Sequence, residues 1–119
     1  MNSSEQPPVR RIASNRLWTP QGVVRWPLVT LSAEGRMLSV EECSDPDRRA
    51  GTEFYAGLLV FGFPADYRRA FAELISRSEE PLMITLPLVV LPEGGIPVVL
   101  SGLDYATLRL TPHAQVRPL

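Results

Sequence analysis

The sequence is poor in the residues that build most catalytic and metal sites. It contains one cysteine and one histidine, and none of its twelve basic residues is a lysine. One cysteine forms no intramolecular disulfide and no CxxC metal site. A hydrolytic metal centre needs several converging ligands and an open position for water, which one imidazole, that of His113, does not supply. We therefore predict no catalytic, cofactor-binding or metal-binding residue, and no cofactor.

Motifs for nucleophilic catalysis and nucleotide binding are also missing. Cys43 has acidic neighbours, which disfavour the reactive thiolate, and neither Cys43 nor Ser101 has a histidine at a recognisable spacing. Gly94–Gly95 belongs to no G-x-G-x-x-G pattern, and a Walker sequence requires a lysine. The adjacent pairs Glu41–Glu42 and Glu79–Glu80 point apart on a strand or a helix, so they indicate solvated charge and not paired catalytic carboxylates.

Charge and hydropathy disfavour two classes of partner. The net charge of −1 and a pI near 5.8 give no basic surface for nucleic acid. Arg48–Arg49 could contact a phosphate, but solvated loop charge is favoured because Asp45 and Asp47 lie beside it. No run reaches the roughly 18 apolar residues of a membrane span, and Asn2–Arg11 is too polar for a signal peptide. We expect a cytoplasmic protein that binds neither nucleic acid nor membranes.

Length and composition indicate a single domain. A chain of 119 residues forms one core, and its 45% apolar and 21% charged residues are typical of a globular protein. Twelve prolines disfavour a helical bundle. Residues 1–9 (MNSSEQPPV) are polar and contain two prolines, so we predict a disordered tail there and one β-domain over residues 10–119.

Runs of β-branched and aromatic residues predict about seven strands. They are expected at residues 11–18, 22–31, 36–41, 52–61, 82–91 and 96–100, with the last at 107–110 or 115–117. Pro27 cannot donate to a sheet ladder, so its strand lies at an edge or is bulged there. Pro87 predicts a kink or bulge in the 82–91 strand. Leu58–Phe61 is apolar on both faces, which predicts cover on both sides.

One amphipathic helix is predicted over about residues 64–78, between the N-terminal and C-terminal strand groups. Pro64 suits its first turn, and the pairs Arg69–Glu73 and Glu73–Arg77 have the spacing of helical ion pairs. An apolar stripe at helical spacing should pack against a sheet; it consists of Tyr67, Ala70, Phe71, Leu74 and Ile75. The fold class is therefore mainly β (α+β), a small β-sandwich or partly open barrel with one helix.

Three segments suggest a relationship to a known family. The first is Ile12–Trp18 followed by Leu28–Leu31 and Gly35–Val40, the second is Glu53–Phe63, and the third is Gly102–Pro112 followed by Val116–Leu119. In this order they resemble the small composite β-domain of the amidohydrolase (metal-dependent hydrolase) superfamily, in its chlorohydrolase- and cytosine-deaminase-like arm. That domain is assembled from sequence on both sides of a (β/α)8 catalytic barrel, and the pattern G-x-L-V-x-P-G-F-V-N-x-H-x-H leads into the barrel.

The resemblance implies the β-domain without the hydrolase site. Tyr67 and Arg69 stand where the family has its two metal-binding histidines, and Phe61 stands where it has a proline. The barrel itself is missing. The favoured interpretation is a stand-alone, non-catalytic domain that acts through binding or assembly. The alternatives are a hydrolase-related enzyme or small-ligand binder with an improvised site, and a regulatory partner of a full-length amidohydrolase. We expect a homodimer, through an edge strand or apolar surface near Trp18 and Trp26, or another protein partner.

Overall fold

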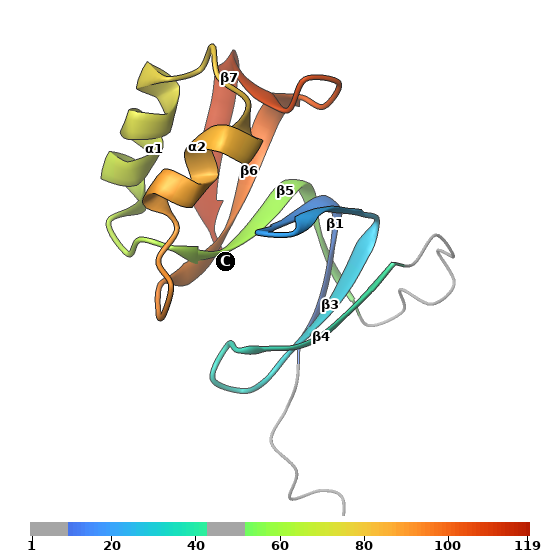
Figure 1. The fold of residues 1–119 in the computed structure, drawn as a ribbon. Helices are drawn as coiled ribbons and strands as arrows, with labels where there is room; N and C mark the ends of the chain where they lie inside the picture. The colour runs from blue at the N-terminus through green and yellow to red at the C-terminus, as the bar shows by residue number, and fades with distance from the viewer. Residues whose placement is uncertain (1–9, 43–51) are drawn as a thin grey trace, which may run out of the picture.

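The computed structural model describes residues 10–42 and 52–119. Within these ranges seven strands form one open sheet, and two helices cover part of one face (Figure 1). In chain order the elements are β1 (Arg10–Thr19), β2 (Gly22–Arg25), β3 (Pro27–Leu31), β4 (Met37–Glu42), β5 (Glu53–Phe63), α1 (Tyr67–Ser76), α2 (Leu82–Val89), β6 (Ile96–Asp104) and β7 (Arg109–Pro118). The predicted mainly β class with about seven strands is confirmed. The tail predicted at residues 1–9, Cys43 and the Arg48–Arg49 loop lie outside the described residues.

The sheet order is β4-β3-β1-β5-β6-β7, with β2 paired to the second half of β1. β5 pairs in parallel with β1 and antiparallel with β6, and the other pairs are antiparallel. β5 therefore joins an N-terminal group of strands to a C-terminal group, and the first and last strands belong to one sheet. β4 and β7 lie at the two ends of this order, and β2 pairs with β1 alone.

Two apolar clusters lie against β5. The larger one lies between the helices and the C-terminal strands, and the side chains of Leu58 and Val60 belong to it. The smaller one contains Leu59 together with Ile12, Leu17, Val29 and Leu31 of β1 and β3. Successive β5 side chains alternate between the clusters, which confirms that this strand is covered on both faces.

A polar contact fixes the bulge where β1 meets β5. The pairing shifts register between Ser14 and Arg16, and the Gly57 N–H donates to Asn15 Oδ1 at 2.9 Å. The backbone carbonyl of Asn15 accepts the Trp26 N–H at 3.0 Å, and Trp26 has a positive φ of 50°. The predicted 22–31 strand is therefore bent at Trp26 into β2 and β3. Pro27 lies at this bend and not on an edge strand, since β3 is flanked by β1 and β4.

The first helix is shorter than predicted. α1 begins at Tyr67, so Pro64 lies in the link from β5 and not in the first helical turn. Ala70 and Leu74 are buried and Tyr67 packs against the larger cluster, but the Ile75 side chain is 39% exposed because it lies about 100° around the helix from Leu74. The described residues form one ion pair, between Arg10 and Glu53, so the two pairs predicted within α1 are not formed.

The predicted strand at residues 82–91 is wrong, because these residues form α2. Leu82, Thr85 and Leu86 are its buried residues, at the spacing of one helical face against the larger cluster. A proline inside a helix costs about 3 kcal/mol, and burying each leucine contributes roughly 1.5–3 kcal/mol, so packing offsets Pro87. The segment is apolar on every side, which hid the helical period from the sequence.

The final strand is longer than either predicted alternative. β7 runs continuously from Arg109 to Pro118 and pairs with a β6 that extends to Asp104. A register shift between Ser101 and Leu103 accommodates the extra β7 residues, and Thr111 Oγ1 donates to the Gly102 carbonyl at 2.6 Å. β7 tolerates its internal proline because an edge strand leaves one row of N–H groups unpaired in any case.

Candidate functional site

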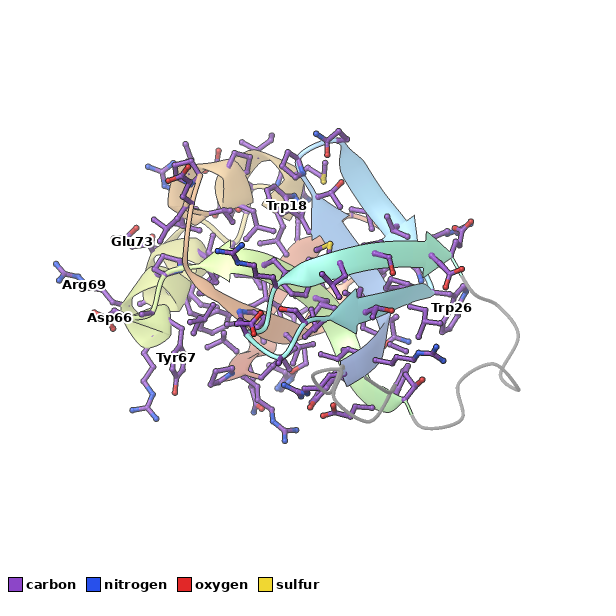
Figure 2. The ribbon with its side chains drawn as sticks, turned by 90° about the horizontal axis from the view of Figure 1, so that it is seen from below. Trp18, Trp26, Asp66, Tyr67, Arg69 and Glu73 are labelled. Atoms are coloured by element: carbon purple, nitrogen blue, oxygen red, sulfur yellow. The ribbon has the colours of Figure 1, made fainter. Side chains whose placement is uncertain are left out.

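The described residues contain no group of three or more histidine, cysteine, aspartate or glutamate side chains that could hold a metal ion. His113 is an exposed residue of β7. Tyr67 and Arg69, at the positions where the resembling family has histidines, point in different directions (Figure 2). Tyr67 packs against the larger cluster, whereas Arg69 is exposed. This pair therefore forms no converging site. No helix in the described ranges has the length and apolar character needed to cross a membrane.

The outer side of α2 is the first unusual surface. We call it the α2 ridge; it consists of Met83, Ile84, Leu88 and Leu91 just beyond the helix, whose exposed fractions are 39%, 55%, 62% and 42%. Scattered apolar side chains are normal on protein surfaces, but an exposed contiguous apolar patch marks an interaction site or a binding groove. Met83, Ile84 and Leu88 share the outer side of α2, because Leu82, Thr85 and Leu86 occupy the buried side, and Leu91 lies two residues beyond the end of the helix.

Charged residues lie beside this ridge. We call them the charge stripe; it consists of Asp66, Arg69, Glu73 and Arg77, which follow one side of α1 and its flanking residues. Figure 2 shows Asp66, Arg69 and Glu73 on the outer side of α1, with Arg69 projecting away from the protein. All four side chains are exposed, and their charges alternate in sign along the helix.

A groove separates the stripe from the ridge. It consists of two adjoining hollows of about 360 and 390 Å³, and both are lined by Glu73, Leu88 and Val89. The α1 wall carries the four stripe residues, while the α2 wall is formed by Thr85, Leu88 and Val89. One wall is therefore charged and the other mainly apolar, an arrangement that suits a protein surface with an apolar centre and a polar rim.

A second hollow lies over β5, β6 and β7, with a volume of about 630 Å³. Three members of a polar cluster, Glu53, Tyr55 and Arg117, line it. Arg10 binds Glu53 through both carboxylate oxygens (Nε to Oε2 2.8 Å, and a second guanidinium nitrogen to Oε1 2.7 Å). Tyr55 donates its hydroxyl proton to Glu53 Oε1 at 2.8 Å. The Arg117 guanidinium lies 5.6 Å from the centre of the Tyr55 ring, at cation–π distance.

This cluster is suited to structure and not to proton transfer. The hydrogen bonds from Arg10 and then from Tyr55 lower the pKa of Glu53 to about 2, while the bond to Glu53 raises the pKa of Tyr55. A general base works best when its pKa lies near the operating pH, and Glu53 lies far below neutrality. The Arg10–Glu53 pair instead ties the start of β1 to the start of β5.

Of the two tryptophans near which the sequence suggested an apolar dimer surface, one is buried and one is exposed. Trp18 is only 5% exposed and belongs to the larger cluster. Trp26 is 42% exposed, and the Arg16 guanidinium lies 5.8 Å from its ring centre and 5.6 Å from that of Tyr105. Burial raises the pKa of Tyr105, with the Arg16 charge acting in the opposite direction. Arg16 thus covers aromatic surface that would otherwise face water.

No family model, curated protein or solved structure matches this chain. The resemblance to the amidohydrolase composite domain stays a prediction. The surface that stands out from the geometry is the α1–α2 face, made of the α2 ridge, the charge stripe and the groove between them. Sequence reasoning identified three of the stripe residues, but as partners within one helix. It missed the ridge because the direction of each α2 side chain depends on that segment being a helix.

Proposed function

We propose that this chain is a non-catalytic β-domain that acts through binding or assembly, as a barrel-less relative of the amidohydrolase composite domain. The observation that carries the proposal is the exposed apolar ridge of α2 beside a row of exposed charges that alternate in sign. Apolar side chains at the centre of a patch supply most of the affinity of a protein interface, and charges around them select the partner.

The arrangement of the sheet supports the family part of the proposal. The segments similar to the two ends of the composite domain meet in one sheet, through the antiparallel pairing of β5 with β6. In the resembling enzymes the chain enters a barrel after the strand equivalent to β5. Here it enters α1 and α2, which return it to β6 across the larger cluster. A domain without its barrel needs other cover for its apolar surface, and α1 and α2 provide that cover on the sheet. A cytoplasmic location remains part of the proposal.

Co-purification with a matched pair of variants tests the binding function. Leu88→Glu places a charge on the ridge, and Leu38→Glu does the same on β4 at a similar exposure, 59% against 62%. We expect the tagged wild-type chain to retain an associated chain after chemical cross-linking, Leu88→Glu to lose it, and Leu38→Glu to keep it. Equal retention by both variants, or no associated chain with the wild type, would contradict the proposal. Recovery of a full-length hydrolase would favour the regulatory-partner alternative.

Metal analysis separates this function from the enzymatic alternative. The described residues offer no cluster of metal ligands, so we expect the purified protein to contain no stoichiometric transition metal. Zinc or iron at one equivalent per chain would overturn the non-catalytic interpretation and favour a hydrolase-related enzyme with an improvised site. The measurement is elemental analysis of the full chain, purified without added metal or chelator.

A further inference from the structure

We propose that the α1–α2 face is the interface of a two-fold symmetric homodimer, in which α1 of one copy lies antiparallel to α1 of the second copy. The inference rests on the proposed function and names its partner. The interface consists of the charge stripe and the α2 ridge, and it contains neither an edge strand nor a tryptophan.

The order of charges along the stripe is self-complementary. Asp66, Arg69, Glu73 and Arg77 read negative, positive, negative, positive in chain order. When the stripe is laid against a reversed copy of itself, Asp66 faces Arg77 of the second copy, and Arg69 faces Glu73 of the second copy. The midpoints of these two pairs differ by half a residue, about 0.75 Å at the helical rise of about 1.5 Å per residue, so both pairs form around one axis. A parallel copy would place like charges opposite each other.

Self-complementarity of this kind is what a two-fold interface requires. If one residue contacts a second across a two-fold axis, the second contacts the first, so each pair occurs twice. The four stripe side chains make no ion pair with one another or with other described residues. A partner unrelated to this chain would need its own matching sequence of charges, whereas a second copy already has it.

The same rotation brings the apolar ridges together. α1 and α2 lie side by side on the sheet (Figure 1), so a two-fold axis crossing both helices lays α1 on α1 and α2 on α2. Leu88 lines both hollows together with Glu73, which places it level with the middle of the stripe. Leu88 therefore lies close to the axis and packs against Leu88 of the second copy. The Leu88 side chain, which is 62% exposed in a single copy, is buried at the centre of this interface.

Charge reversal gives a test that a purely local effect cannot reproduce. In a dimer of Arg69→Glu, the new carboxylate faces Glu73 of the second copy, and in a dimer of Glu73→Arg the new guanidinium faces Arg69. Each variant alone should dimerise about tenfold more weakly than the wild type, because two favourable rim pairs become two repulsive ones. An equimolar mixture of the two variants should form a mixed dimer of near wild-type affinity, since both pairs then have opposite charges. The measurement is sedimentation velocity of the full chain.

Cysteine cross-linking locates the axis. In a Cys43→Ser background, Leu88→Cys should form a disulfide-linked dimer under mild oxidation, and Leu38→Cys should not. Cross-linking of Leu38→Cys alone would place the dimer interface at the β4 edge and overturn the inference. The inference would also be overturned if a mixture of Arg69→Glu and Glu73→Arg associates no better than either variant by itself. A monomeric wild type whose Leu88 surface captures a different chain would refute the homodimer and leave the proposed binding function intact. A monomer that captures nothing would refute both.

Discussion

Asn15 and Gly57 show how single residues determine the geometry of this sheet. Gly57 lies at a bulge with a φ of 140°, and a side chain at this position would collide with the backbone carbonyl of Leu100 on β6. The Asn15 side-chain oxygen accepts the Gly57 N–H, while its own carbonyl accepts the N–H of Trp26 at the bend between β2 and β3. One asparagine on β1 thus binds both β5 and the bend between β2 and β3, at the point where the sheet changes register.

Replacing Gly57 with alanine should lower the free energy of unfolding by about 3 kcal/mol, since the methyl group meets backbone and the conformation is strained. Gly35→Ala is the matched control. Gly35 also has a positive φ, of 85°, but no atom lies within 4 Å of the added methyl group, so strain alone should cost about 1 kcal/mol. Urea unfolding of both variants checks this prediction. Equal losses would show that the approach of Leu100 does not matter.

The Arg10–Glu53 pair predicts a pH dependence at the acid end. The pKa of Glu53 is lowered in the folded protein from 4.5 to about 2, so ionised Glu53 stabilises the fold above pH 4.5. That contribution should be lost progressively as the pH falls from 4.5 towards 2. Both side chains are more than two-fifths exposed, and solvent screening limits the contribution to less than about 1 kcal/mol.

NMR titration of the Glu53 carboxyl group measures this directly. We expect its midpoint to lie below 4.5 in the wild type and closer to 4.5 in Arg10→Met, which removes the guanidinium but keeps an unbranched side chain. A wild-type midpoint near 4.5 would show that the pair is not maintained in solution. The stability difference between the wild type and Glu53→Gln should shrink over the same pH range.

At the scale of elements, α2 marks the limit of what the sequence predicts. The apolar stripe of α1 follows from a local pattern, because this helix has one polar face and one apolar face. Residues 82–91 have no polar face, so neither a helical nor a β period is visible. Pro87 then favoured a strand. Only tertiary packing selects the helix, because in the helical conformation Leu82 and Leu86 both pack into the larger cluster.

Pro87→Ala should stabilise the protein by about 1–2 kcal/mol. The substitution supplies an N–H that can donate to the carbonyl four residues earlier and removes the steric conflict of the proline ring, while a more flexible unfolded chain offsets part of the gain. Pro87 is exposed, so no buried contact is lost. Chemical denaturation tests the expectation, and a destabilised variant would indicate that the proline is needed for the position of the ridge.

At the scale of the whole molecule, the candidate site depends on the arrangement of both helices. The charges of the stripe are visible in the sequence, and their spacing suggested pairing within α1. Their role changes once the helix is placed, because Ala70 and Leu74 face the sheet and the stripe turns towards α2 and solvent. The ridge could not be predicted at all, because exposure of Ile84 and Leu88 follows from the side of α2 that the sheet covers.

A dimer through this face links stability to concentration. Association stabilises the folded chain by mass action, so the melting temperature of the wild type should rise with protein concentration. Leu88→Glu should remove this dependence, and Leu38→Glu should retain it. Differential scanning calorimetry over a wide concentration range distinguishes the two cases. A melting temperature independent of concentration in the wild type would argue against self-association.

The central place of β5 also has a kinetic consequence. Hairpins such as β3–β4 and β6–β7 join residues that are close in sequence, whereas the β1–β5 pairing begins with Ile12 and Glu53, which are 41 positions apart. Closing a long loop costs entropy before any contact compensates for it, so this pairing should limit the rate of folding. Because both clusters contain β5 side chains, we expect neither group of strands to persist alone, and the domain should fold and unfold in a single cooperative step.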